Sequence, residues 1–290
     1  MQIRKAVLPV AGLGTRILPA SKVIPKEMLP LVDKPTLQYI VEEAVEAGVE
    51  EIIFVISPSK QSIVDHFLPF PELEEVLQRK GKRAELEELR RVQSMASYTS
   101  VIQPQPLGLG HAVLCARELV GDEPFIVMLG DDLVDPQTPV LPQMMELFEQ
   151  YGGSVLSLFH AQPEEISALG IAAVEELGNE VVQITHLVEK PAPEEAPSDL
   201  AVAGRYILTP DLFSLLEKTP PGRGGEIQIT DAIEMQAQAG RCYGVRFNGT
   251  RYDTGTPLGL LTTAISYGLK RPDLAPALEE FMRQTLSEEA

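Results

Sequence analysis

Apolar runs of strand length alternate with amphipathic stretches of helical length in the first half of the chain. Lys5–Val10 and Glu51–Ile56 are short, mostly apolar runs, which is typical of strands buried on both faces of a parallel sheet. Between them, Thr36–Ala47 repeats apolar residues at helical spacing and stops before Gly48, so we expect a helix there. Strand alternating with helix predicts an α/β fold with a mostly parallel sheet flanked by helices.

The alternation continues and then becomes richer in strands. We expect a strand that ends at Val101–Ile102, a helix at His111–Leu119 and a strand at Phe125–Leu129. Beyond Ser154, three further strand patterns follow at 171–174, 181–188 and 202–208. The loops 11–16, 103–110 and 130–132 each follow a predicted strand. Because ligands of parallel sheets bind at the carboxyl ends of the strands, these loops are candidates for a binding site.

Two segments stand outside this alternation. Residues 71–93 are dense in Glu, Lys and Arg with leucines at helical spacing, which predicts an exposed helical insertion with ion pairs between residues four apart. Pro272–Leu286 predicts a final helix that packs on the body or on a neighbouring subunit.

The net negative charge of the chain limits the kinds of partner that it can bind. A formal net charge of −18 over 290 residues argues against nucleic acid or an anionic membrane surface. No stretch approaches the roughly 18 apolar residues of a membrane span, and the N-terminus lacks the pattern of a signal peptide. Cys115 and Cys242 form neither a zinc spacing nor a disulfide framework, so we expect a cytoplasmic protein.

One short segment is positively charged, in contrast to the chain as a whole. Arg16, Lys22 and Lys26 lie in a stretch, 16–26, that contains no acidic residue. They follow Ala11-Gly12-Leu13-Gly14-Thr15, where two glycines directly after a strand let backbone N–H groups approach an anion. Arg16 can bind phosphate oxygens through its guanidinium fork, and Lys26 adds a point charge. Ile17 stands where a dinucleotide fingerprint needs glycine, and the chain contains no P-loop motif.

The segment AGLGTRILPASKVIPKEMLPLVDKP, residues 11–35, resembles the signature of the sugar-nucleotidyltransferase family. That signature reads G-x-G-T-R-x-x-P, then a lysine ahead of Leu-Pro, then D-K-P. Further matches follow in the family's order along nearly the whole chain, at Gln103–Pro104, Gly108–Ala112, Gly130–Asp132, Val188–Pro191, Glu226–Ala232 and Tyr252–Gly255. The charged insertion and the segments GLGHAVLCA and EIQITDAI are most similar to the branch of the family that uses UTP and glucose 1-phosphate.

The resemblance implies one nucleotidyltransferase domain over residues 1–290, built on a Rossmann-like, mostly parallel or mixed sheet. Residues 1–150 would form the nucleotide-binding half, with the charged helical insertion 71–93. Residues 151–270 would form a smaller, sugar-phosphate-binding β/α half, and residues 271–290 a C-terminal helix.

The resemblance also implies the residues of the site. Ala11, Gly12, Gly14, Thr15, Gln103 and Gly108 would bind the nucleotide, and Gly170, Glu189, Lys190 and Val202 the sugar phosphate. Arg16, Lys26, Asp131 and Lys190 would be catalytic residues, and Asp131 and Asp253 would hold Mg²⁺. These residue types suit the roles. The Gln103 amide offers the donor and the acceptor that a uracil edge requires, and Mg²⁺ combines few protein carboxylates with phosphate oxygens.

Neighbouring residues would support these groups. Asp131 follows an apolar strand, so its carboxylate is expected at the carboxyl edge of the sheet, with Asp132 beside the metal rather than on it. His111 is expected in the first turn of a helix, in a structural role. Glu189 and Lys190 are adjacent, so their side chains share a site only because Pro191 breaks the strand at that point.

The implied reaction is an attack by a phosphate oxygen of glucose 1-phosphate on the α-phosphorus of UTP, giving UDP-glucose and pyrophosphate. A phosphate monoester is already ionised at neutral pH, so no general base is required. The expected partners are these two small molecules and further copies of the chain, as a dimer or tetramer.

Alternative functions would require different residues. A member of the same family could use dTTP or another hexose 1-phosphate. A nucleotide-binding regulatory or scaffold subunit without turnover would have lost Arg16, Asp131, Lys190 or Asp253, and all four are present. An NAD-dependent oxidoreductase would need an acidic residue after the second strand, where the chain has Ser57-Pro58-Ser59-Lys60.

Overall fold

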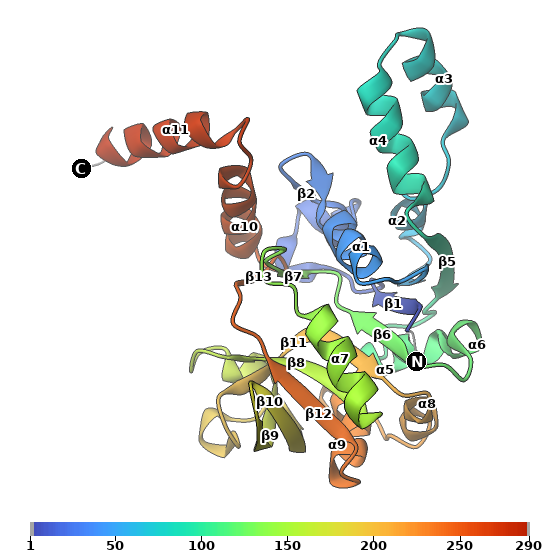
Figure 1. Ribbon diagram of the computed structural model, residues 1–290, viewed down its shortest axis with the longest axis vertical. Helices are drawn as coiled ribbons and strands as arrows, with labels where there is room; N and C mark the ends of the chain where they lie inside the picture. The colour runs from blue at the N-terminus through green and yellow to red at the C-terminus, as the bar shows by residue number, and fades with distance from the viewer. Residues whose placement is uncertain (1–2, 289–290) are drawn as a thin grey trace.

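The computed structural model describes residues 3–288 and arranges them around one twisted sheet with helices on both faces (Figure 1). Within this range, nine strands form the sheet in the order β5-β4-β1-β6-β11-β8-β12-β10-β9. In chain order these strands are β1 (Lys5–Pro9), β4 (Glu51–Ile56), β5 (Ser97–Ile102), β6 (Phe125–Met128), β8 (Ser154–His160), β9 (Gly170–Gly178), β10 (Val181–Glu189), β11 (Leu200–Leu208) and β12 (Cys242–Arg246). The shorter strands pair separately, β2 (Pro30–Leu31) with β3 (Lys34–Pro35) and β7 (Asp132–Val134) with β13 (Arg251–Asp253).

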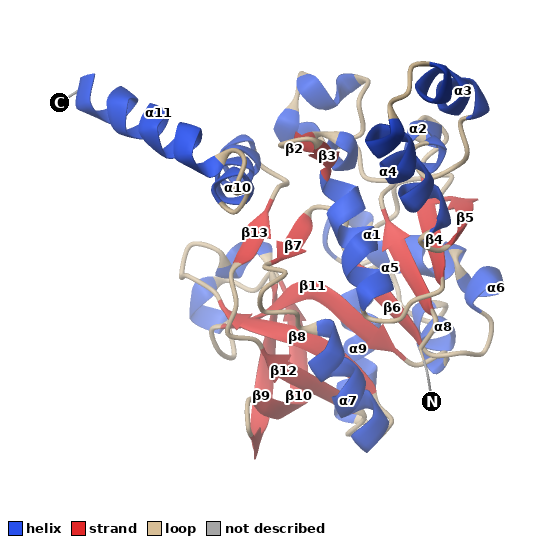
Figure 2. Cartoon of the chain, turned by 45° about the horizontal axis from the view of Figure 1, so that its top comes forward, coloured by secondary structure: helices blue, strands red, loops and turns tan. Residues whose placement is uncertain are grey.

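Helices connect the strands and cover both faces (Figure 2). They are α1 (Thr36–Glu46), α2 (Gln61–Asp65), α3 (Pro71–Arg79), α4 (Arg83–Ser94), α5 (Leu109–Cys115), α6 (Arg117–Val120), α7 (Leu141–Tyr151), α8 (Asp211–Leu216), α9 (Ile229–Gln238), α10 (Pro257–Leu269) and α11 (Ala275–Glu288). Three 3-10 turns, η1 (Thr15–Ile17), η2 (Ala20–Lys22) and η3 (Lys26–Met28), shape the basic loop after β1. Between residues 3 and 288, no helix is long and apolar enough to span a membrane.

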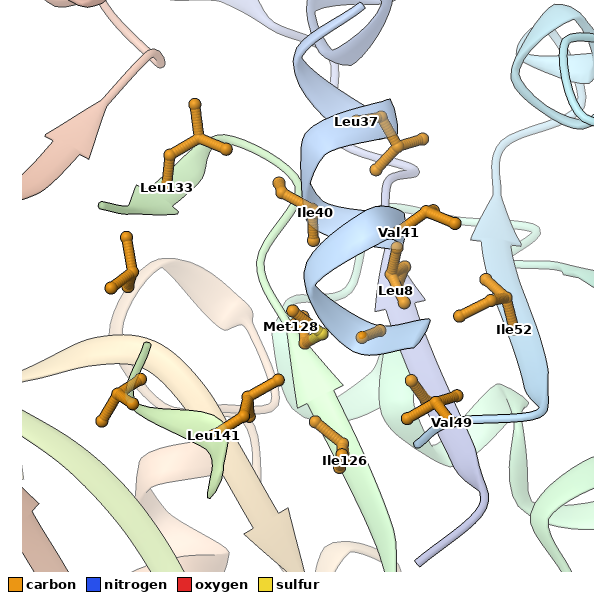
Figure 3. Close-up of a cluster of buried hydrophobic side chains, with 14 of the residues drawn as sticks. Leu8, Leu37, Ile40, Val41, Val49, Ile52, Ile126, Met128, Leu133 and Leu141 are labelled. Carbon is orange, nitrogen blue, oxygen red and sulfur yellow. The ribbon is translucent and has the colours of Figure 1, made fainter. Parts of the chain in front are cut away.

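Alternate strand residues point into two hydrophobic cores, one on each face of the sheet. On one face, the apolar side of α1 covers Leu8, Ile52 and Ile126 (Figure 3). On the other face, Val7 and Val127 belong to a core that also contains side chains of α5, α8 and α9. Burying one such aliphatic side chain contributes about 1.5–3 kcal/mol, so both cores hold the strands in fixed positions.

The sheet is parallel in its first half and mixed in its second. β1 pairs in parallel with β4 and β6, and β4 pairs in parallel with β5. β11 runs antiparallel to both β6 and β8, which reverses the direction at the centre of the sheet. The prediction of an α/β fold with a mixed sheet flanked by helices is therefore confirmed.

The second half of the sheet closes on itself. β9 and β10 form an antiparallel hairpin at the end of the strand order. β11 pairs with β9 through Ala201 and Ile171, in addition to its pairing with β8. The strands β11, β8, β12, β10 and β9 thus form a ring, which brings the start of β9 next to the start of β11.

The predicted elements agree with the structure, with some differences of detail. The expected helix at 111–119 is two helices, because α5 ends at Cys115 and α6 begins at Arg117. The charged insertion forms the hairpin of α3 and α4, which projects from the body (Figure 1). The ion pairs between nearby residues of this insertion join residues three apart, such as Lys82 with Glu85, rather than four apart. Helices α2, α7, α8, α9 and α10 are additional to the predicted elements.

The expected C-terminal helix is present as α11, which projects beyond α10 on the opposite side from α3 and α4 (Figures 1 and 2). The first two positions of the expected segment 1–150 and the last two of 271–290 lie outside the described residues.

Candidate active site

The glycine loop after β1 folds back on itself at the carboxyl edge of the sheet. Gly14 has a φ of 67°, in the left-handed region that favours glycine. A Cβ on Gly14 would lie 3.1 Å from the Cβ of Ser21 and 3.4 Å from the Cβ of Lys26. Ser21 Oγ also donates to the main-chain oxygen of Gly14, at 2.7 Å. The loop is therefore packed against the stem of Lys26, while Ala11 is buried and Gly12, Thr15 and Arg16 face solvent.

Two acidic turns from distant parts of the chain meet beside this loop. Asp131 follows β6, and Asp253 ends β13. The backbone N–H and the hydroxyl of Thr254 both donate to the main-chain oxygen of Asp131, at 2.8 and 2.9 Å. The N–H of Gly255 donates to Asp253 Oδ1 at 2.8 Å. These bonds bring the Asp131 and Asp253 carboxylates to the same small space.

Basic side chains of the glycine loop enter that space. Lys26 Nζ donates to Asp131 Oδ2. The guanidinium of Arg16 lies between the two acids, 3.8 Å from Asp131 Oδ2 and 4.0 Å from Asp253 Oδ2. A Cβ on Gly255 would lie 2.6 Å from Arg16 Nη2, 2.8 Å from Asp131 Oδ2 and 2.9 Å from Asp253 Oδ1, so a side chain there would fill the space.

The protonation state of Asp131 follows from these neighbours. Burial acts to raise its pKa, but Lys26 and Arg16 favour the carboxylate, and the net result is a pKa below its ordinary value. Asp131 is therefore ionised at neutral pH.

Asp132 has different surroundings from Asp131. Its side chain is 5% exposed and pairs with Arg251 Nε at 2.9 Å. Burial raises its pKa to about 6, although Arg251 and Arg205 oppose this. Gly204, with a φ of 59°, packs on Asp132, since a Cβ there would lie 2.8 Å from Oδ2. Asp132 therefore connects β7 to β13 and β11. Its ion-pair partner is Arg251, whereas Arg16 and Lys26 contact Asp131.

Gln103 follows β5 and is buried, beside the loop that leads into α5. Its Nε2 donates to the main-chain oxygen of Gly108 at 3.0 Å and lies 3.1 Å from His111 Nδ1. Gly108 has a φ of 98°, and a Cβ there would lie 2.8 Å from the oxygen of Ile227. His111 thus orients the Gln103 amide, and the Gln103 carbonyl oxygen is the atom that has no hydrogen-bond donor among the described residues.

The residues predicted for the sugar phosphate lie at the broken end of β10. Lys190 has a φ of 48°, and its Nζ lies 2.9 Å from Glu189 Oε1. Thr230 Oγ1 donates to Glu189 Oε2 at 2.6 Å. Glu189 is the register partner of Gly170, and a Cβ on Gly170 would lie 3.4 Å from Glu189 Oε2. The break in the strand places two adjacent side chains on one side, as the sequence predicts.

The closed ring of strands brings Glu189 and Lys190 towards the turns that carry Asp131 and Asp253. Val188 is paired with Ile171, and Ile171 with Ala201, whose neighbour Val202 is buried. Two residues further along β11, Gly204 packs on Asp132. The buried Tyr206 is influenced by both Glu189 and Asp132, and its pKa is raised by burial and by these carboxylates.

The structure also shows contacts within the site that the motifs alone do not reveal. Thr230 orients Glu189, Arg251 neutralises Asp132, and Gly204 leaves room for Asp132. A buried pair, Glu27 with Lys60, lies under the basic loop. Glu27 follows Lys26 inside the matched signature, which is the one signal that could have indicated it.

The site suits a cation that relies on a ligand's oxygens for most of its coordination. Among residues 3–288, no group of three or more His, Cys, Asp and Glu side chains could hold a metal ion. Two carboxylates do face a common space, and a positive group, the Arg16 guanidinium, already lies between them. Mg²⁺ is commonly bound by one or two carboxylates together with substrate phosphates, so the residues fit this ion.

Comparison with known proteins agrees with this geometry. Residues 5–267 match the nucleotidyl transferase family. The chain belongs to this family. It is 46% identical over 288 residues to the UTP–glucose-1-phosphate uridylyltransferase of Bacillus subtilis (strain 168), covering 99% of each chain.

Solved structures of similar proteins cover nearly all of the chain. A UTP-bound UGPase from Acinetobacter baumannii is 42% identical, with a TM-score of 0.90, covering 97% of this chain and 99% of that one. A UDP-glucose pyrophosphorylase complexed with UDP-glucose is 43% identical, with a TM-score of 0.84, covering 93% of this chain and 100% of that one.

Proposed function

We propose that this chain transfers the uridylyl group of UTP to glucose 1-phosphate, producing UDP-glucose and pyrophosphate. The observation that carries the proposal is the meeting of Asp131 and Asp253 around Arg16, next to Lys26, at the carboxyl edge of the sheet. Relatives that are 42–46% identical along nearly the whole chain bear the names of this activity or hold UTP or UDP-glucose.

The chain's residues divide the work of positioning two anions. Arg16 and Lys26 bind the triphosphate, and the backbone from Ala11 to Thr15 follows its oxygens. Lys190 binds the incoming phosphate of glucose 1-phosphate, and Glu189, held by Thr230, accepts hydrogen bonds from sugar hydroxyls. Gly170 and Val202 form the neighbouring wall. A phosphate oxygen of glucose 1-phosphate then forms a bond to the α-phosphorus of UTP. At the same time, the bond between the α-phosphorus and the bridging oxygen of the departing pyrophosphate breaks.

Asp131 and Asp253 are proposed to hold Mg²⁺. When bound, this ion would neutralise charge on the α-phosphate and on the leaving pyrophosphate. The depressed pKa of Asp131 keeps a carboxylate available for it at neutral pH.

The nucleotide base is proposed to lie against Gln103 and Gly108. Because the Gln103 amide nitrogen is used within the chain, its carbonyl oxygen is the group that accepts from N3–H of uracil. Cytosine has an acceptor at the same position, so this contact favours UTP over CTP.

We further propose a cytoplasmic homo-oligomer. The two cysteines are free, which suits a reducing compartment. Leu258 on α10 and Phe281 and Leu286 on α11 are 71%, 64% and 68% exposed. Helix α11 projects from the body and packs on α10, where Gly268 meets Leu278. A helix of this length is marginal in water without tertiary contacts, so a second copy, as a dimer or tetramer, would cover these side chains.

The proposed reaction is tested by measuring pyrophosphate release across a grid of nucleoside triphosphates and sugar 1-phosphates. We expect the highest kcat/KM with UTP and glucose 1-phosphate. A higher value with dTTP, or with another hexose 1-phosphate, would reassign the substrates within the family.

Replacing Gln103 by Ala is expected to reduce the preference for UTP over CTP more than it slows turnover at saturation. A hydrogen bond of this kind contributes about 0.5–1.5 kcal/mol, equivalent to a change of about 2- to 13-fold in the ratio of kcat/KM values. His111→Ala, which removes the orienting partner, should have a smaller effect in the same direction. Unchanged nucleotide ratios in Gln103→Ala would exclude this residue from base recognition.

Replacing Asp131 or Asp253 by Asn is expected to lower kcat by orders of magnitude and to raise the Mg²⁺ requirement, with little effect on folding. Asn keeps an oxygen at each position, including the one that accepts from Gly255 N–H, but removes a charge from the site. Activity should also disappear in EDTA and return with Mg²⁺. Asp211→Asn, at an aspartate paired with Arg241 away from the site, is the matched control.

The double variant distinguishes one shared ion from two independent roles. If both carboxylates serve the same ion, the double variant should be little slower than either single variant at saturating Mg²⁺. Losses that multiply would show that the two aspartates act independently.

Light scattering of the wild-type protein is expected to give a mass above that of one chain. Phe281→Glu, which places a charge in the exposed apolar surface of α11, should shift the protein towards the monomer, whereas Ser287→Glu should not. A monomeric wild-type protein would contradict the proposed assembly.

A further inference from the structure

A buried ion pair lies directly beneath the basic loop, and none of the roles assigned above involves it. Lys60 Nζ lies 2.8 Å from Glu27 Oε2, and the two side chains are 9% and 2% exposed. The same Nζ donates to the main-chain oxygen of Val10 at 2.7 Å. Lys60 comes just after β4, and Glu27 is the middle residue of η3. One ammonium group therefore joins segments that follow two different strands.

The pair also contacts the third segment of the site. A Cβ on Gly130 would lie 2.7 Å from Val10 Cγ1 and 3.1 Å from Glu27 Cγ, so Gly130 packs closely on both residues. The next residue is Asp131, which accepts from Lys26. The Glu27–Lys60 pair thus lies where the Val10–Gly14 loop, the η3 turn and the Gly130–Asp131 turn come together.

A contribution to folding stability does not by itself explain why Glu27 and Lys60 are buried as an ion pair. Burial raises the pKa of Glu27 and lowers that of Lys60, because both charges lose their water, and the mutual attraction of the pair opposes these shifts. A buried ion pair is often no more stabilising than apolar side chains of the same volume. What apolar side chains cannot provide is a directed bond from Lys60 to the Val10 carbonyl and to the turn that presents Lys26.

We infer that Glu27 and Lys60 are positioning residues that hold Lys26 and the Val10–Gly14 backbone in register with Asp131. The inference rests on the proposed function, in which Lys26 and this backbone bind the triphosphate. Glu27 and Lys60 are enclosed by the chain and act through Lys26 and the loop. They therefore affect binding of the nucleotide, whereas the sugar phosphate is bound by residues at the end of β10.

The test compares three variants of the full chain. Lys60→Met removes the ammonium at similar volume and leaves Glu27 without its partner. The double variant Glu27→Leu with Lys60→Met fills the same space with apolar side chains and leaves no unpaired charge. Leu147→Ala truncates a core side chain of α7 and controls for a general loss of stability. For each variant, the Tm and the KM values for UTP and for glucose 1-phosphate are measured.

Lys60→Met is expected to raise the KM for UTP by about 10- to 100-fold, the effect of small misplacements in a site, while the KM for glucose 1-phosphate stays near the wild-type value. The double variant should regain most of the lost Tm but keep the raised KM for UTP. It also serves as the test if Lys60→Met does not fold. Leu147→Ala should lower the Tm without changing either KM.

Three results would overturn the inference. They are a double variant with the wild-type KM for UTP, equal increases in both KM values in Lys60→Met, and a similar rise in the KM for UTP in Leu147→Ala. The wild-type rate with UTP and glucose 1-phosphate tests the proposed function separately. If the wild-type protein prefers another nucleoside triphosphate, the same comparison is made with that nucleotide.

Discussion

The pairing of β7 with β13 joins two parts of the chain that carry the acidic groups of the site. Asp132 faces Asp253 in the register of this pair, and Arg251, two residues before Asp253, neutralises the buried Asp132. Removing one partner of a buried ion pair of this kind typically costs about 3–5 kcal/mol. Together with the bonds from Thr254 to Asp131 and from Gly255 to Asp253, this pairing brings the carboxylates of Asp131 and Asp253 together.

The charges of the site are balanced within the chain itself. Lys26 pairs with Asp131, Arg16 lies between Asp131 and Asp253, and Lys190 pairs with Glu189. In the proposed reaction, a triphosphate bound by Lys26 and Arg16 would draw these cations away from the two aspartates. The aspartates would then need a different positive partner, and the proposed Mg²⁺ would supply it. Such an exchange would let a chain with a net charge of −18 bind polyanions through a small basic site.

Much of the fold could be predicted from local pattern. Glu51–Ile56 is predicted with the bounds that the structure has, because a buried parallel strand is a continuous apolar run. The closure of β11 onto β9 could not be predicted, since it depends on one long-range pairing that leaves no periodicity in the sequence. Among the site residues, Arg16, Lys26, Asp131 and Asp253 were indicated by their motifs. The orientation of Gln103 by His111 and the partner of Glu27, which is Lys60, depend on segments that meet only after folding.

The end of β10 shows how the chain solves a local geometric problem. Adjacent residues of a strand point to opposite faces, yet Glu189 and Lys190 form an ion pair. A positive φ at Lys190 achieves this, at a strain of order 1–3 kcal/mol for a residue other than glycine. The bond from Lys190 N–H to the Leu169 oxygen, at 2.9 Å, holds the backbone in this conformation. Glycine would adopt it without strain but has no ammonium group, so the proposed role of Lys190 in binding the sugar phosphate would explain why the strain is kept.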